Sequence, residues 1–229
     1  MIPEEALRLK AWVEHTLKPD YIIGVDEVGY GAWAGPLTVG GVALIRGWEH
    51  KLVKDSKSLS STKREKAFPI IEEAALTWTV EYCPAVIIDE IGLGVALQRL
   101  NACVILKLLK KIPHGSLTVV VMDGNMEVTH PLVASGVVQC LVVATPKADV
   151  AFSAVSAASI MAKVSRDREM AEYHRCYPQY CWDRNKGYGT PHHVDALRNY
   201  GPCELHRMSY QPLQELNVSR IKDGEKPGS

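Results

Sequence analysis

The sequence has no excess of charge of either sign. Its 229 residues include 26 basic and 26 acidic side chains, so the formal net charge is +0. A nucleic-acid partner therefore cannot be inferred from bulk charge, and any basic footprint must be local. Hydrophobic residues make up 47% and charged residues 23%, which is ordinary for a globular domain. The length fits one domain with a small appendage.

Membrane and disulfide signals are also lacking. No apolar stretch approaches the length of a membrane span, and no signal peptide opens the chain. The six cysteines contain no Cys-x-x-Cys pair, and the spacing of Cys176 and Cys181 near His174 is unlike that of common zinc sites. We therefore expect free thiols, a cytoplasmic location and no membrane partner. No internal repeat is present, and we expect a monomer.

The chain is organised around residues 21–36. Tyr21 to Val25 is a β-branched apolar run, which predicts a buried strand. It ends in Asp26 and Glu27, and glycines follow at 29, 31 and 35. Carboxylates are costly to bury unless a cation meets them, and glycines let the backbone approach a ligand closely. This layout is typical of a functional site.

The remaining segments alternate between strand and helix patterns. Apolar runs predict strands over 37–45, 77–82, 117–122 and 137–144. Helical spacing of apolar residues predicts helices over 3–17, 62–76, 87–110, 149–173 and 191–200. Interleaved strands and helices indicate an α/β fold.

Two further acids occupy comparable positions. Asp123 ends the apolar run 117–122, and Asp149 stands at the start of a helix. If strands 21–25 and 117–122 are parallel neighbours, their carboxyl ends meet at the edge where ligands of α/β sheets collect. The side chains of adjacent strand residues point to opposite faces, so Asp26 and Glu27 can both contribute to one site only if the strand ends or twists there.

Four carboxylates at one edge repel each other unless cations intervene. Hard divalent ions such as Mg²⁺ or Mn²⁺ meet this need, because they prefer oxygen ligands. Two such ions, about 3.5–4 Å apart, clamp the attacking and leaving oxygens of a phosphodiester. The acids therefore predict phosphodiester hydrolysis. Taken singly, Asp123-Gly124 is more typical of a turn and Asp149 of a helix cap.

Several motifs occur in an order that resembles ribonuclease HII, the type 2 ribonuclease H, from Tyr21 to about Leu213. They are Gly24 to Gly29 with Ala34-Gly35-Pro36, Asp55-Ser56-Lys57, Asp123-Gly124-Asn125, Lys147-Ala148-Asp149, Ala157 to Val164 with Arg166-Asp167, Lys186-Gly187-Tyr188, and His206-Arg207. Each motif alone is weak evidence for the resemblance, but the occurrence of all of them in this order is specific to the family.

The resemblance implies a ribonuclease H-like mixed sheet flanked by helices, with a C-terminal helical extension. It divides the chain into an N-terminal helical extension (1–20), a catalytic domain (21–175) and a C-terminal extension completing the substrate surface (176–229). It also implies cleavage of the RNA strand of RNA–DNA hybrids. Incision 5′ of single ribonucleotides in duplex DNA, leaving 3′-hydroxyl and 5′-phosphate ends, is implied as well.

The resemblance also assigns roles to residues. Asp26, Glu27, Asp123 and Asp149 match the acids that hold two Mn²⁺ or Mg²⁺ ions. Gly29, Tyr30 and Gly31 match the loop that meets the ribose 2′-hydroxyl, and Tyr188 matches the tyrosine that stacks on the sugar at the junction. Lys57, Lys163 and Arg166 would contact phosphates; individually, such residues are more often a solvated face.

Two features depart from the family pattern. Tyr30 stands where the family usually has Arg, which removes a charge-assisted phosphate contact. The interval between Asp123 and Asp149 is long, with extra residues around 127–138. Two alternatives stay open: an RNA–DNA junction-binding protein with weak catalysis, and a DNA junction resolvase of the same fold. Gly29 and Tyr188 argue against the resolvase.

Overall fold

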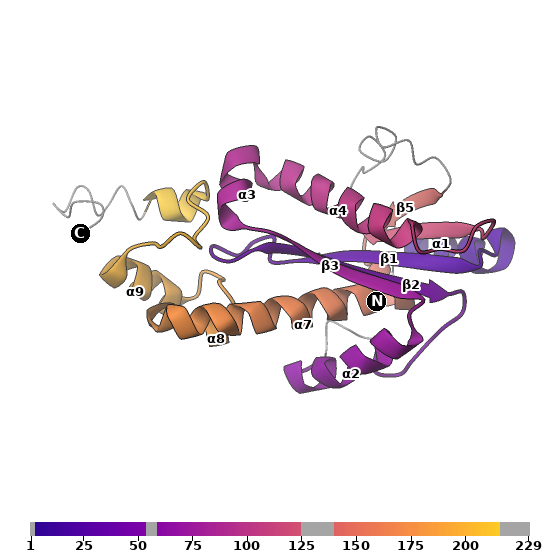
Figure 1. Ribbon diagram of the computed structural model, residues 1–229, viewed down its shortest axis with the longest axis horizontal. Coiled ribbons are helices and arrows are strands. Elements are labelled where there is room, and N and C mark those ends of the chain that lie inside the picture. Colours follow the sequence, from indigo (N-terminus) through magenta and orange to yellow (C-terminus); the bar gives the residue numbers. More distant parts are fainter. Residues whose placement is uncertain (1–2, 54–58, 125–139, 216–229) are drawn as a thin grey trace. The chain divides into compact units, whose positions relative to one another are not determined.

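The computed structural model describes residues 3–53, 59–124 and 140–215 (Figure 1). By their contacts these residues form two compact units. The first comprises the described residues within Met1–Val28, Thr38–Glu81 and Leu97–Ser165, and the second comprises those within Gly29–Leu37, Tyr82–Ala96 and Arg166–Ser229. The division at residues 20 and 175 that the sequence suggests stays a prediction.

A five-stranded mixed sheet has the strand order β3-β2-β1-β4-β5. β1 pairs antiparallel with β2 and parallel with β4, and β4 pairs parallel with β5. This confirms the predicted α/β class with a mixed sheet. The parallel pairing of β1 with β4 also meets the condition under which the acids at the ends of these two strands come together at one edge. The strands are β1 (Tyr21–Val28), β2 (Leu37–Ile45), β3 (Thr77–Cys83), β4 (Thr118–Asp123) and β5 (Leu141–Thr145).

Two predicted long helices are each divided near their start. Gly92, with φ +83°, separates α3 (Ala85–Ile91) from α4 (Leu93–Leu109). Extended Phe152, with φ −112° and ψ 120°, separates α6 (Ala148–Ala151) from α7 (Ser153–Cys176). The predictions of one continuous helix over 87–110 and one over 149–173 are therefore wrong. The spacing of hydrophobic residues does not reveal a single residue that leaves the helical conformation.

Of the other helical segments, those within 3–17, 61–74 and 191–200 lie close to their predicted positions, whereas the two short ones over 178–185 were not predicted. These helical segments are α1 (Glu4–Ala11), the π-helix η1 (Trp12–Leu17), α2 (Ser61–Ala74), the 3₁₀ turn η3 (Pro178–Tyr180), α8 (Trp182–Asn185) and α9 (Pro191–Tyr200). Within the described ranges, no helix by itself has both the length and the apolar character needed to cross a membrane; α3 and α4 reach them only as a bent pair.

Glycines in the central strands let helices of the first unit pack closely on both faces of the sheet (Figure 1). A Cβ at Gly24 would lie 2.0 Å from the backbone carbon of Ala154 in α7. A Cβ at Gly41 would lie 2.3 Å from Val104 in α4. Side chains are therefore excluded at these strand positions, and the alanines of α7 approach the strand backbone directly.

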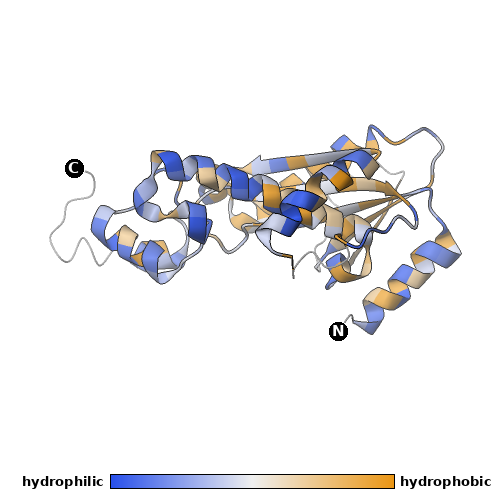
Figure 2. Cartoon of the chain, turned by 90° about the horizontal axis from the view of Figure 1, so that it is seen from below, coloured by the Kyte–Doolittle hydropathy of each residue, from blue (hydrophilic) through white to orange (hydrophobic). Residues whose placement is uncertain are grey.

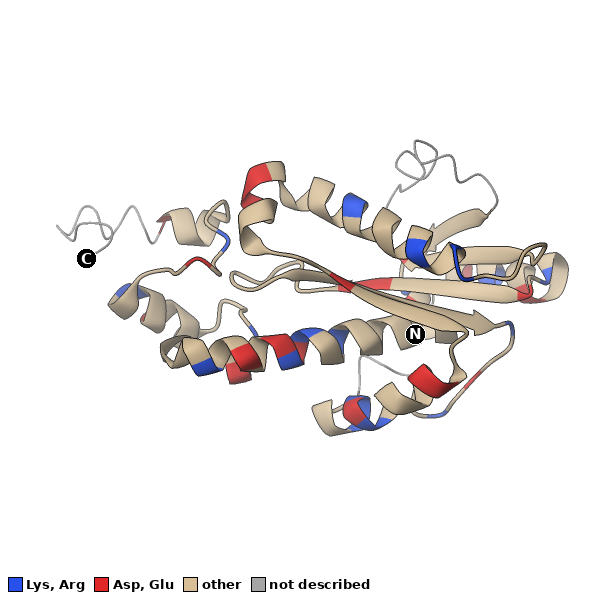
Figure 3. Ribbon diagram, viewed as in Figure 1, with Lys and Arg blue, Asp and Glu red and all other residues tan. Residues whose placement is uncertain are grey.

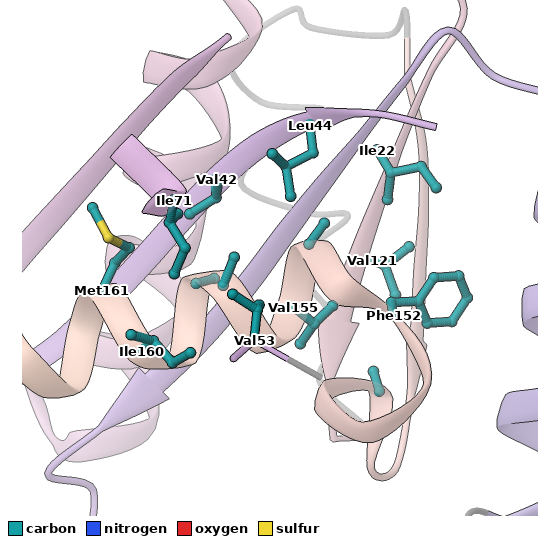
Figure 4. Packing of buried hydrophobic residues seen from close by; sticks show 14 of the residues in the cluster. Ile22, Val42, Leu44, Val53, Ile71, Val121, Phe152, Val155, Ile160 and Met161 are labelled. Atoms are coloured by element: carbon teal, nitrogen blue, oxygen red, sulfur yellow. The ribbon is translucent and has the colours of Figure 1, made fainter. Parts of the chain in front are cut away.

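The core of the first unit lies between the sheet and α7 (Figure 4). Figure 2 shows hydrophobic residues concentrated along the strands, whereas the helices carry hydrophilic faces. The close packing of these side chains makes the sheet a rigid platform for residues at its strand ends. The labelled core residues are Ile22, Val42, Leu44, Val53, Ile71, Val121, Phe152, Val155, Ile160 and Met161.

The second unit has its own small core, in which the rings of Tyr180 and Trp182 stack with centroids 4.9 Å apart. Its buried members are Ala34, Met170, Tyr180, Trp182, Ala196, Leu197 and Leu213. The segment containing Ala34 comes from the glycine-rich loop after β1, so this core holds that loop against the C-terminal part of the chain.

Candidate active site

A pocket of about 370 Å³ opens where the pairing of β1 with β4 ends. β1 continues to Val28 alongside β2, but its parallel register with β4 ends at Val25. Asp26 and Glu27 both line the pocket although they are successive strand residues. The strand therefore does not end at Asp26, and it is the partner strand β4 that stops. The pocket is lined by Asp26, Glu27, Val28, Arg64, Asp123, Ser159, Ile160 and Lys163.

Asp26 is the most perturbed acid of this pocket. Its side chain is buried, and this burial together with the negative charge of Glu27 raises its pKa to about 8. A hydrogen bond from Ser159 lowers the pKa, whereas the carboxylates of Asp123 and Asp149 raise it. The protein alone therefore favours a protonated Asp26 at neutral pH, and a nearby cation would reverse that preference.

Asp123 and Asp149 are linked through the backbone between them. Oδ1 of Asp123 accepts hydrogen bonds from the N–H groups of Gly124, at 3.1 Å, and Ala148, at 2.9 Å. Asp149 is buried in α6, and its backbone carbonyl accepts a hydrogen bond from the Ser156 hydroxyl. Asp149 does not line the pocket, but its charge acts on Asp26.

The donor set suits a hard divalent cation. The charges of Glu27, Asp123 and Asp149 all act on Asp26, and carboxylate oxygen is the ligand that Mg²⁺ and Mn²⁺ prefer. In the described part of the chain, no three His, Cys, Asp or Glu side chains are gathered closely enough to form a ready-made metal site. The acids are therefore suitable ligands for a divalent ion because of their carboxylate oxygens, and binding of the ion would draw these side chains together.

Two basic side chains, Lys163 of α7 and Arg64 of α2, face these acids across the pocket. Lys163 was expected from its motif, whereas Arg64 and Ser159 were not singled out. The four-residue spacing of Ser159 and Lys163, which puts them on one helix face, is a signal that would have found Ser159. Figure 3 shows the mixture of basic and acidic residues along α7. Arg64 has no comparable sequence signal.

The glycine-rich loop after β1 belongs to the second unit. Gly29 is buried with φ +86°, a conformation that favours glycine, whereas Gly31 is exposed and Tyr30 is 49% exposed. Further along the loop, the N–H groups of Trp33 and Ala34 donate to the carbonyl of Gly187, at 2.8 and 3.1 Å. The loop is thereby tied to the segment that carries Tyr188, which is half-buried.

Arg166 does not lie on a solvated surface as a phosphate contact would require. It is 0% exposed, and it donates hydrogen bonds to the carbonyls of Pro36, Lys186 and Ala34 at 2.9, 2.8 and 3.1 Å. Its guanidinium carbon lies 5.7 Å from the ring centroid of Tyr188. This geometry corrects the expected direct phosphate contact to a role in holding the loop. Lys57 and most of the long interval before Asp149 lie outside the described residues.

Comparisons with known proteins agree with these observations. The family model described as Ribonuclease HII matches residues 23–213. A ribonuclease HII from Endomicrobium trichonymphae is 39% identical over 201 residues, covering 88% of this chain and 90% of that protein. The crystal structure of ribonuclease H2 from Pyrococcus horikoshii OT3 superposes with a TM-score of 0.71 at 26% identity, covering 88% of this chain and 99% of that one.

A more distant structure shows the same fold. Bst-RNase HIII in complex with Mn²⁺ superposes with a TM-score of 0.69 at 20% identity, covering 93% of this chain and 74% of that one. The family match extends over both compact units and includes all four acids, the glycine-rich loop and Tyr188. The chain therefore belongs to the ribonuclease HII family of ribonuclease H endonucleases.

Proposed function

We propose that this protein hydrolyses the RNA strand of RNA–DNA hybrids and incises duplex DNA 5′ of single ribonucleotides, leaving 3′-hydroxyl and 5′-phosphate ends. The observation that carries the proposal is the gathering of acids where the parallel pairing of β1 with β4 ends: Asp26, Glu27 and Asp123 line one pocket, and burial with the charges of Glu27, Asp123 and Asp149 raises the pKa of Asp26 to about 8. Perturbed acids in a cleft are typical of catalytic sites.

Asp26, Glu27, Asp123 and Asp149 would hold two Mg²⁺ or Mn²⁺ ions. When bound, such ions supply charge neutralisation and Lewis acidity to a phosphodiester. Burial of Asp26 by the sheet fixes the position of its carboxylate, and the Asp123 hydrogen bond to Ala148 fixes the start of the helix that carries Asp149. The chain thus restricts where two of the acids lie, and ion binding would draw the carboxylates together.

The other pocket residues would position the substrate. Lys163 and Arg64 supply positive charge on the side of the pocket formed by helices, which suits a phosphate of the scissile strand. In the second unit, exposed Gly31 offers its backbone to the ribose 2′-hydroxyl, the group that distinguishes RNA from DNA. Tyr188 is the expected stacking partner of the sugar at the junction.

The decisive experiment maps cleavage of a DNA duplex with one embedded ribonucleotide, an RNA–DNA hybrid, an all-DNA duplex and an all-DNA four-way junction. We expect divalent-ion-dependent incision 5′ of the ribonucleotide, cleavage of the hybrid and no cleavage of either DNA substrate. Asp26→Asn should abolish incision, whereas Glu73→Gln, which changes an exposed acid of α2, should not.

Two results would contradict the proposal. Gel-shifted but uncut duplex with excess Mn²⁺ would indicate a junction-binding protein, and cleavage of the DNA junction at the rate of the ribonucleotide duplex would indicate a resolvase. The monomeric state and the cytoplasmic location stay predictions from the sequence.

A further inference from the structure

A buried arginine of the C-terminal segment donates hydrogen bonds to backbone carbonyls of the glycine-rich loop. Arg207 is 0% exposed. Its Nε and Nη2 atoms both donate to the carbonyl oxygen of Gly35, at 3.1 and 3.0 Å. Its Nη1 atom donates to the carbonyl oxygen of Tyr30, at 3.0 Å, and to the hydroxyl of Tyr210, at 2.7 Å. Arg207 thus holds the loop near both of its ends with three hydrogen bonds, and it donates a fourth to Tyr210.

The Tyr210 hydroxyl completes a closed arrangement. It accepts from Arg207 and donates its own proton to the carbonyl oxygen of Tyr30, at 2.6 Å. The guanidinium carbon of Arg207 also lies 5.3 Å from the ring centroid of Tyr210. The carbonyl oxygen of Tyr30 therefore accepts two hydrogen bonds, one of them from a charged donor, which is the stronger class of hydrogen bond.

This arrangement determines where the next N–H group points. A trans peptide unit is planar, and its C=O and N–H bonds point in opposite directions. The carbonyl of Tyr30 and the N–H of Gly31 belong to the same peptide unit. Because the carbonyl is directed toward the buried guanidinium, the Gly31 N–H is directed away from it, and Gly31 is an exposed residue.

We propose that Arg207 and Tyr210 are positioning residues that orient the Gly31 N–H toward the substrate by holding the Tyr30 carbonyl. The inference rests on the proposed contact between this loop and the ribose 2′-hydroxyl. It also explains how the loop keeps its shape with Tyr at position 30: the backbone is held through its carbonyl, and the side chain, 49% exposed, takes no part in the arrangement.

Tyr210→Phe tests the proposal, because it removes only the hydroxyl of a half-buried ring. Ser209→Ala is the matched control: the Ser209 hydroxyl donates to Asp89, at 2.6 Å, and does not contact the loop. We expect Tyr210→Phe to lower kcat/KM on a single-ribonucleotide duplex about tenfold, mainly through KM, as the loss of about 1.4 kcal/mol of positioning implies. Ser209→Ala should change it less than about twofold.

Amide hydrogen exchange over residues 29–36, measured without substrate, tests the positioning role of Arg207 and Tyr210 independently of the proposed function. We expect faster exchange in Tyr210→Phe and Arg207→Lys than in wild type or Ser209→Ala, because Lys cannot reproduce the planar fork. Equal exchange and equal KM in Tyr210→Phe and Ser209→Ala would overturn the positioning role. If the wild-type protein leaves the ribonucleotide duplex uncut, the proposed function is overturned instead. The exchange rates alone would then decide whether Arg207 and Tyr210 hold the loop backbone.

Discussion

The backbone N–H of Ala148 donates a hydrogen bond of 2.9 Å to Oδ1 of Asp123, so the acid at the end of β4 holds the start of α6. The next residue is Asp149, whose carboxylate acts on Asp26. One carboxylate thus combines a structural hydrogen bond with a negative charge in the pocket, and substitutions can separate the two.

Asp123→Asn keeps an acceptor oxygen for Ala148 and removes the charge, whereas Asp123→Ala removes both. We expect both variants to lose at least about a hundredfold in kcat/KM, which corresponds to about 2.7 kcal/mol of transition-state stabilisation. Urea denaturation should show Asp123→Ala to be about 1 kcal/mol less stable than Asp123→Asn, the usual contribution of one hydrogen bond. Equal stability of the two variants would mean that the hydrogen bond to Ala148 does not hold α6.

Gly24→Ala should destabilise the protein, because the new methyl group would lie 2.0 Å from the backbone of Ala154 and α7 would have to move. Overpacking of this kind typically costs about 1–3 kcal/mol. Gly94→Ala in α4 is the control, since a Cβ there meets nothing within 4 Å and Ala favours helix over Gly. Thermal denaturation should therefore show a lower Tm for Gly24→Ala and an unchanged or higher Tm for Gly94→Ala.

Acid should weaken the second unit through two buried histidines. The Nε2 atoms of His193 and His206 lie 3.1 Å apart, and Nδ1 of His206 accepts from the N–H of Cys203 at 2.9 Å. The proton of neutral His206 therefore lies on Nε2. Burial, and then the neighbouring His193, lower the pKa of His206 from 6.5 to about 4, and burial lowers the pKa of His193.

Because these folded-state pKa values lie below the unfolded value, the unfolded chain binds more protons in acid. The stability contributed by His206 is fully present above about pH 6.5 and is lost as the pH falls from there toward about 4, by up to about 1.4 kcal/mol per pH unit, and protonation of His193 adds to the loss. Urea midpoints between pH 8 and pH 4.5 measure this loss. His206→Asn should reduce the slope, whereas His15→Asn, at an exposed histidine, should leave it unchanged.

Tyr30→Arg should strengthen binding to nucleic acid without changing the loop backbone, because the Tyr30 side chain is exposed and its carbonyl alone is held. One added phosphate contact should steepen the dependence of log Kd on log salt by about 0.9 for a duplex. Binding titrations of a catalytically inactive protein at several salt concentrations measure this slope. Tyr30→Gln, which introduces a polar but uncharged side chain at the same position, should leave the slope of the wild type.

Local patterns were sufficient to predict the strand core of the fold and the order of its acids. The β-branched run before Asp26 and the run before Asp123 predicted two buried strands. Their parallel pairing was only a condition of the sequence argument, and the structure meets it. The same patterns did not reveal the interruptions at Gly92 and Phe152, since one non-helical residue barely alters the spacing of apolar positions.

The sequence by itself therefore determined the fold class and the family, because hydrophobic periodicity and the order of short motifs can be read along the chain. The assignment of the four acids as metal ligands stays a prediction. Only the tertiary structure decided what the basic residues do. Lys163 lines the acidic pocket, whereas Arg166 is buried beneath loop carbonyls that come from residues 130 positions away. Exposure and hydrogen-bond partners depend on segments distant in the chain, and no local pattern encodes them.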